Sequence, residues 1–202
     1  KVDNCQVGVF ASFGADEHDV LVNAKLYLPE EWASDWGRCK KVKIPDADQV
    51  CVPKHVMALQ MVKHARDLGL EFDWVAADGG YGHIPAFLCG LAEMGETLMV
   101  DVHSDQAIYL EPPRPSVPVA NHRGRPASRL VSHAEPLEVR ALVDTTPESA
   151  WKTIRVRDTT KGWLEIALLT RHVWLWDGKE QETLELTLVI RNDKCADGFS
   201  TA

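Results

Sequence analysis

A short apolar segment that ends on one acid among glycines is the feature that most restricts the fold of this chain. The segment WVAADGGYG, residues 74–82, reads as a buried strand that stops at Asp78. Three glycines, with Tyr81 between them, then turn the chain. Open α/β sheets place ligand and metal chemistry at the carboxyl ends of their strands. The segment therefore favours an α/β fold with Asp78 at its functional edge.

The spacing of apolar residues predicts alternating strands and helices in the first half of the chain. The order of a hairpin, a helix, a strand, a helix and a strand indicates a mixed sheet with helices, which is the α/β class. The apolar strand that leads to Asp78 suits a position buried on both faces. Between hairpin and first helix we expect an irregular segment that packs Trp32 and Trp36 over the sheet. The expected elements are strands at 5–13 and 20–28, a helix at 53–68, a strand at 72–77, a helix at 84–94 and a strand at 97–102.

The second half has a different character. Residues 112–133 contain five prolines and predict an extended linker or loop. Strand-like segments follow, with a hairpin turn at Asp177 and Gly178. We therefore expect three parts: an α/β core at 1–110, a Pro/Arg-rich linker at 111–135, and a β-rich insertion or subdomain with an unmatched tail at 136–202. The expected strands of the last part are 151–157, 164–170, 173–176 and 184–191.

Composition excludes several classes of protein. The chain has no apolar run of the roughly 18 residues that a membrane helix needs and no signal peptide, so a cytoplasmic location without membrane contact is expected. The five cysteines are scattered, which favours reduced thiols. No GxxxxGK[ST], HExxH or GxSxG motif appears. P-loop hydrolases, zinc peptidases and serine hydrolases therefore lack their usual signatures.

The charge pattern leaves room for local binding of DNA. A net charge of -8 argues against a protein that coats nucleic acid, because phosphate binding uses accumulated Lys and Arg. Residues 111–134 nevertheless hold four arginines against one glutamate. In HRGRPASR, residues 122–129, an extended Arg-Gly-Arg-Pro unit could enter the minor groove of A·T-rich DNA, or it could be a solvated basic loop. The arginines concerned are Arg123, Arg125 and Arg129, and a smaller basic patch contains Lys40, Lys41 and Lys43.

Asp78 is the first candidate for site chemistry. A carboxylate beside glycines at a strand end is a ligand type suited to a hard cation, although it could also cap the next helix. Asp101, His103 and Asp105 alternate in VDVHSDQ and would share one side of a continuing strand. They could join Asp78 in a metal cluster or form a plain polar strand end. His83 could contact a phosphate or cap a turn.

The order of five segments resembles the DDE superfamily of bacterial insertion-sequence transposases. These segments are KVDNCQVGVF, LYLPEEW, the helix opened by Pro53, WVAADGGYG and MVDVHSDQAIYLEPP. The resemblance covers residues 1–115 and, through WKTIRVRDTTKG, part of 151–191. It implies a ribonuclease H-like fold and DNA cleavage and strand transfer in DNA transposition, with recombination of transposon ends and target DNA. It also implies two Mg²⁺ or Mn²⁺ ions held by Asp, Asp and Glu. Asp78 matches the second of these carboxylates, while Gly79 and Gly80 would keep the strand end open to DNA.

Other parts of this family pattern are missing from the sequence. The first Asp of the family lies on a strand upstream of KVDNCQ, and the Glu lies on a helix beyond the β-rich insertion, where this chain has RNDKCADGFSTA. We therefore expect an incomplete catalytic domain, a fragment that does not cleave or join DNA by itself. The missing strand belongs between the hairpin and the strand that leads to Asp78. Its loss is expected to expose two long sheet edges.

Three hypotheses about function remain open from the sequence. The first is a fragment of a DDE transposase. Such a fragment would bind DNA as its partner and could form a homo-oligomer. The second is a non-catalytic DNA-binding remnant that uses Arg123, Arg125 and Arg129. The third is an unrelated metal-dependent hydrolase built on Asp78, Asp101 and His103.

Overall fold

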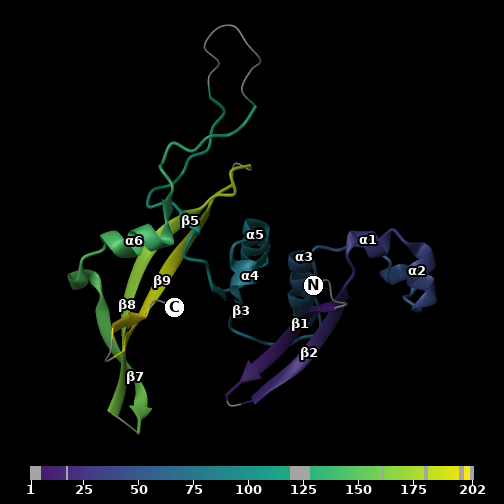
Figure 1. Cartoon of the computed structure of the whole chain (residues 1–202), viewed down its shortest axis with the longest axis horizontal. Coiled ribbons are helices and arrows are strands. Elements are labelled where there is room, and N and C mark those ends of the chain that lie inside the picture. The colour runs from purple at the N-terminus through teal and green to yellow at the C-terminus, as the bar shows by residue number, and fades with distance from the viewer. Residues whose placement is uncertain are drawn as a thin grey trace. The chain divides into compact units, whose positions relative to one another are not determined.

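The computed structural model describes residues 6–16, 18–118, 128–160, 162–179, 182–195 and 198–200. The chain forms two compact units, Lys1–Asp101 (unit 1) and Val102–Ala202 (unit 2), which are described separately below (Figure 1). The predicted mixed α/β class is confirmed, since both strands and helices build unit 1. Among the described residues, the helices are too short or too polar to cross a bilayer.

Unit 1 begins with the predicted antiparallel hairpin. Strand β1 (Val7–Ala15) pairs with β2 (His18–Tyr27), with a bulge in β2 after the pair Ala11 and Asn23. Helix α3 (Lys54–Asp67) packs on the hairpin and stops before Gly69, whose φ of 81° suits glycine. The apolar face of α3 meets the alternating inward residues of β1, which makes a small core of Val9, Met57 and Met61.

Between the hairpin and α3, the expected irregular segment contains two short helices instead. Helix α1 (Glu30–Ala33) packs on α2 (Trp36–Lys41), and a 3₁₀ turn, η1 (Asp46–Asp48), follows. The expectation that Trp36 packs over the sheet is wrong, because its exposed fraction is 57%. The fully buried Cys39 fills the space near the half-buried Trp32 instead, and its Sγ donates to the Trp32 carbonyl.

The strand that leads to Asp78 is shorter and more exposed than predicted. Strand β3 (Val75–Ala77) pairs in parallel with β4 (Leu98–Val100), and its middle residue is exposed. Trp74, just before it, is 51% exposed. Among the described residues β3 pairs with β4 alone, so the expectation of a strand buried on both faces is wrong. Helix α4 (Gly79–Gly82) and the predicted helix α5 (Pro85–Glu93) follow β3.

The two pairs of strands in unit 1 form separate sheets. Among the described residues, β1 is hydrogen-bonded only to β2, and β3 only to β4. They share a layer of helices, because α3 packs on both β1 and α5, and α5 packs on β4. The single mixed sheet expected from the sequence is thus divided between its antiparallel and parallel parts.

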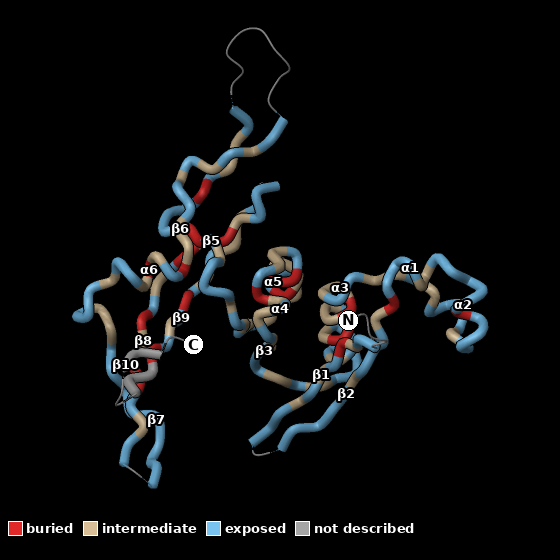
Figure 2. Tube along the Cα trace, in the orientation of Figure 1, coloured by how far each residue is buried: buried red, intermediate tan, exposed pale blue. Residues whose placement is uncertain are grey.

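Unit 2 is built on an antiparallel sheet with the order β10-β9-β8-β7. Its buried residues lie mainly on β8, on the short strand β5 and on α6, and Figure 2 shows buried stretches along these elements. The predicted segments 164–170 and 173–176 are one continuous strand, β8, and the sequence did not indicate α6. The strands are β7 (Lys152–Thr159), β8 (Gly162–Leu175), β9 (Leu184–Cys195) and β10 (Gly198–Ser200). The other elements are β5 (Ala107–Ile108), β6 (Leu137–Glu138), α6 (Val139–Thr145) and a 3₁₀ turn, η2 (Glu148–Ala150).

The proline-rich segment returns on itself at its described ends. Ser116 and Val131 exchange backbone hydrogen bonds of 3.1 and 3.0 Å in an isolated bridge. The short strands β5 and β6 pair just outside this bridge. The division of the chain into three parts at 1–110, 111–135 and 136–202 stays a prediction.

Two contacts fix the helices of unit 1 beside the parallel strands. Gly82 in α4 lies so close to β4 that a Cβ atom there would overlap the carbonyl oxygen of Asp101. Arg66, near the end of α3, donates to both carboxylate oxygens of Glu96 at 2.8 and 2.7 Å and to the Phe72 carbonyl at 2.7 Å. The Glu96 side chain is only 6% exposed.

We expect Gly82→Ala to destabilise unit 1 by about 3 kcal/mol or more, because the clash is with backbone and no side-chain rotation relieves it. Thermal unfolding of the purified chain measures the loss. Gly37→Ala is the matched control, since its Cβ would meet only Asp35 Oδ1 at 3.6 Å, an ordinary contact. Equal stability of the two variants would contradict the close approach of α4 to β4.

We expect Glu96→Gln to lower the melting temperature by a few degrees at neutral pH. The hydrogen bonds from Arg66 lower the pKa of Glu96 against the opposing effect of burial. The stabilisation by the carboxylate is therefore present above the unfolded-state pKa of about 4.3 and is lost as the pH falls through the lower folded-state value. Melting temperatures at a series of pH values should converge for the two proteins in acid. A difference that stays constant down to acid pH would argue against the ion pair as the cause.

Candidate active site at the end of the parallel strands

The carboxyl ends of β3 and β4 bring two acidic residues to the same edge. Ala77 and Val100 are the last register partners, and Asp78 and Asp101 follow them directly. The Asp101 N–H donates to the Ala77 carbonyl at 3.1 Å, so the pairing extends to this residue. The edge of the parallel pair is where α/β sheets gather ligands. Sequence reasoning correctly located Asp78 at a strand end.

Asp78 caps the one-turn helix α4. Its backbone is extended, with φ -73° and ψ 173°, and its Oδ1 accepts the Gly80 N–H at 2.9 Å. The Asp78 carbonyl accepts the N–H groups of Tyr81 and Gly82 at 3.0 and 3.2 Å. Capping uses one carboxylate oxygen, and among the described residues no hydrogen bond engages Oδ2. The residue is exposed, so a cation can reach that oxygen from solvent.

Tyr81 connects this turn to the core. Its ring is 5.1 Å from that of Phe87, centroid to centroid, and it also packs against the core of Val9, Met57 and Met61. Burial, and secondarily the nearby Asp78 carboxylate, raises the pKa of the Tyr81 hydroxyl. The phenol therefore stays protonated at neutral pH. Its ring supports the position of α4.

The other residues considered for a metal cluster do not assemble into one. Strand β4 ends at Val100, and the Gln106 N–H donates to the His103 carbonyl at 3.0 Å in a turn. The strand therefore does not continue through Asp101, His103 and Asp105, and the alternative of a plain polar strand end agrees with this. Within the described residues, no group of three or more His, Cys, Asp or Glu side chains is placed to hold a metal ion.

His83 and the arginines show different outcomes. His83 Nδ1 lies 2.9 Å from the Gly79 carbonyl, so an N–H there closes the α4 turn as the capping alternative expected. Arg129 is exposed at the described end of the proline-rich segment. Arg123 and Arg125 lie outside the described residues. DNA binding by these arginines stays a prediction.

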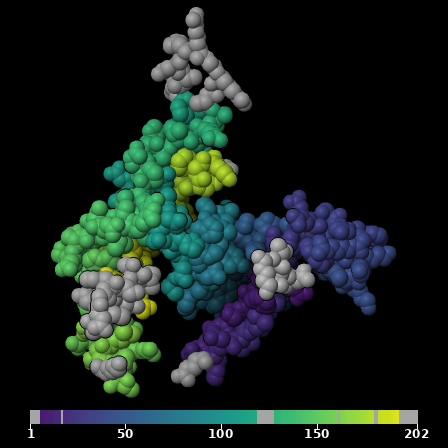
Figure 3. Space-filling view, in the orientation of Figure 1, coloured from purple at the N-terminus to yellow at the C-terminus, as the bar shows by residue number. Residues whose placement is uncertain are grey.

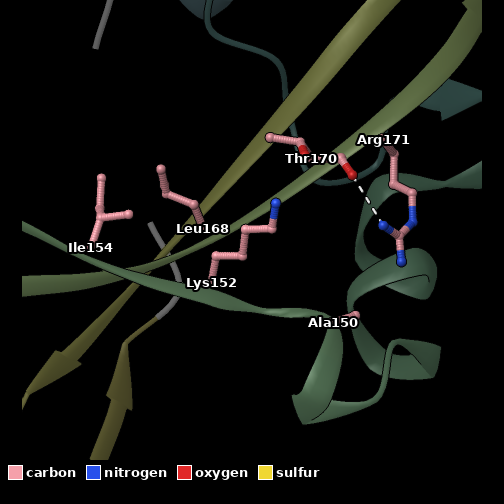
Figure 4. Close-up of a pocket in the computed structure, with 6 residues that line it drawn as sticks. All are labelled: Ala150, Lys152, Ile154, Leu168, Thr170 and Arg171. Atoms are coloured by element: carbon pink, nitrogen blue, oxygen red, sulfur yellow. Dashed lines mark hydrogen bonds between the residues drawn. The ribbon is translucent and has the colours of Figure 1, made fainter.

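Sequence reasoning missed a pocket in unit 2. A cavity of about 300 Å³ opens on the sheet formed by β7 and β8 (Figure 4). Lys152 and Arg171 provide its charge, and the Arg171 guanidinium donates to the Thr170 carbonyl at 3.0 Å. Its lining among the described residues contains two cations and no carboxylate. Recognising it requires the register that pairs Lys152 with Leu168, which short segments do not specify. The lining residues are Ala150, Lys152, Ile154, Leu168, Thr170 and Arg171.

Comparisons with known proteins identify the family. A family profile described as DDE superfamily endonuclease matches residues 1–163, which include Asp78 and extend past β7. This is most of the chain and joins the two regions in which the sequence segments resemble that family. Searches of curated proteins and of solved structures found no match. The chain belongs to the DDE superfamily endonucleases.

Proposed function

We propose that this chain is part of an insertion-sequence transposase that cleaves and transfers DNA strands in DNA transposition, with Asp78 as one of its metal ligands. The observation that carries the proposal is the position of Asp78 at the carboxyl end of a parallel pair, within the region matched by the family. A DDE endonuclease domain implies DNA as the substrate. Transposon ends and target DNA are the partners proposed here, and a homo-oligomeric state stays a prediction.

The described residues do not fit a complete two-metal centre. Two divalent cations that clamp an in-line phosphoryl displacement require several hard oxygen ligands in one place. Asp78 supplies one exposed carboxylate, and Asp101 follows the neighbouring strand, but no three-residue cluster forms among the described residues. The remaining ligands are therefore proposed to come from outside these residues. Mg²⁺ or Mn²⁺ is the proposed ion because both accept carboxylate oxygen.

The separated sheets support an incomplete ribonuclease H-like core. Both β1 and β3 present unpaired backbone edges among the described residues, while α3 and α5 cover the two sheets with one layer. A strand placed between β1 and β3 would join the hairpin and the parallel pair into a single mixed sheet. We assign to this position the strand that bears the first family carboxylate. The sheet of unit 2 is the proposed β-rich insertion.

The other two hypotheses have less support. The hydrolase hypothesis needs His103 in a metal cluster with Asp78 and Asp101, and such a cluster does not form among the described residues. The remnant hypothesis depends on Arg123, Arg125 and Arg129, of which the first two lie outside the described residues and the third is exposed. The family match also covers the catalytic region rather than the arginine-rich segment alone.

We expect Asp78→Asn to weaken Mn²⁺ binding while leaving the fold intact, because a neutral amide oxygen replaces a charged carboxylate ligand. An amide oxygen still accepts the Gly80 N–H, and Asn and Asp are comparable helix caps. Asp78→Ala loses the cap as well, at a cost of about 1 kcal/mol. Mn²⁺ titration followed by electron paramagnetic resonance measures binding, and thermal unfolding measures the cap.

The matched control for Asp78→Asn is Asp35→Asn. Asp35 is also a helix cap, since it accepts the Arg38 N–H at 2.9 Å, but it does not follow a parallel strand. Its amide variant should bind Mn²⁺ as the unchanged chain does. Equal Mn²⁺ affinity in the unchanged chain and in Asp78→Asn would remove Asp78 from the metal site.

We also expect the purified chain to leave transposon-end DNA intact in Mg²⁺ or Mn²⁺. One protein carboxylate supplies too few ligands to hold two metal ions. Nicking of a labelled duplex, compared with Asp78→Ala, measures this. Metal-dependent cleavage that disappears in Asp78→Ala would show that the chain assembles a competent centre by itself.

A further inference from the structure

A run of exposed basic residues lies in the second half of α2 and just after it in unit 1. Unit 1 contains nine Lys and Arg residues against sixteen Asp and Glu, yet residues 38–43 contain four cations and no acid. Figure 3 shows this region as the dark blue end of unit 1, open to solvent on the viewed face. We call it the α2 basic surface, and it consists of Arg38, Lys40, Lys41 and Lys43.

Acids flank this surface in the sequence (Glu30, Glu31, Asp35, Asp46 and Asp48), but in the described part of the chain they are not ion-paired with its cations. None of the four takes part in an ion pair within the described residues. The Arg38 guanidinium lies 3.8 Å from the centroid of the Trp32 ring, and Lys40 Nζ lies 4.7 Å from that of Trp36. The nearest capping acid, Asp35, is engaged with the backbone of Arg38. The positive charge is therefore available to an external anion.

The end of α2 holds Lys43 in a conformation that favours glycine. Its φ is 61°, and the helix closes through hydrogen bonds from Lys43 N to Lys40 O at 3.1 Å and from Ile44 N to Cys39 O at 3.0 Å. Glycine is the usual residue at this position because a side chain is strained there. A lysine at this position adds a cation to the surface despite the strain. Retained backbone strain is a feature of functional sites.

The surface is also fixed in position. Asp35 caps the start of α2, and the fully buried Cys39 anchors it to α1 through the Trp32 carbonyl at 3.1 Å. Trp36 is 57% exposed beside Lys40, so an aromatic face accompanies the charges. A preorganised group of cations loses little freedom when an anion binds. These properties suit a rigid polyanion.

We infer that the α2 basic surface binds the phosphate backbone of duplex DNA, independently of the metal-binding carboxylate. DNA presents one charge per roughly 1.7 Å of helix axis, and proteins bind this backbone through exposed Lys and Arg. Lysines act on phosphates as point charges and carry no base specificity. The inference rests on the proposed DNA substrate but assigns its backbone to residues other than Asp78. It identifies a contact that positions DNA rather than one that reacts with it.

The test measures binding of a labelled duplex of random sequence in EDTA, from 50 to 200 mM salt. In Lys40→Gln with Lys41→Gln, the slope of log affinity against log salt should fall by about 1.8, since each lost phosphate contact contributes about 0.9. Affinity at the lowest salt should fall by at least about tenfold. Thermal unfolding confirms that the variant is folded.

The control variant removes the same charge elsewhere. Lys63→Gln with Lys179→Gln alters one exposed lysine paired with Asp67 and one in the turn after β8, and its salt slope should not change. An equal loss in both variants, or none in the α2 variant, would overturn the inference. Absence of binding by the unchanged chain would also overturn it. Because EDTA removes metal, Mn²⁺ binding at Asp78 remains a separate test of the proposed function.

Discussion

The geometry of the candidate site depends on how closely α4 approaches the end of β4. Only a residue without a side chain fits at Gly82, where the Asp101 carbonyl occupies the space of a Cβ atom. That approach places a helix of a single turn directly after β3, and Asp78 closes it through Gly80. The carboxylate is consequently held at the strand end by backbone contacts on both sides. Tyr81 adds a side-chain anchor in the core.

This arrangement separates two kinds of charge within unit 1. The acids at the ends of β3 and β4 suit a cation, whereas the basic residues gather on α2. In a protein that acts on DNA, the acidic group can take part in the chemistry, and the basic group can bind the phosphate backbone. The overall negative charge of the chain conceals this division, because it sums the surface over both groups.

Local signals in the sequence predicted the elements that have clear boundaries. Gly69 and Gly95 end α3 and α5 at positive φ, and Pro85 opens α5, so both helices could be located closely. The same reasoning placed Asp78 at a strand end. It did not anticipate α1 and α2, because helices of four and six residues carry almost no periodicity. The division into separate sheets and the Lys152 pocket depend on long-range pairing, which spacing along the chain does not encode.

Strands β1 and β7 each lie at the edge of a sheet, and they differ in the features that discourage pairing with another chain. Strand β7 carries Lys152, Arg155 and Arg157 and bulges between the two arginines, and both features discourage association along an edge. Strand β1, with the sequence VGVFASFGA, contains no charged residue and no proline, and its register bulge lies on β2. The β7 edge of the unit 2 sheet is thus protected against pairing with a further strand. The edge of β1 carries none of these features within the strand itself, so it is the edge of the two that is better suited to pair with another extended segment.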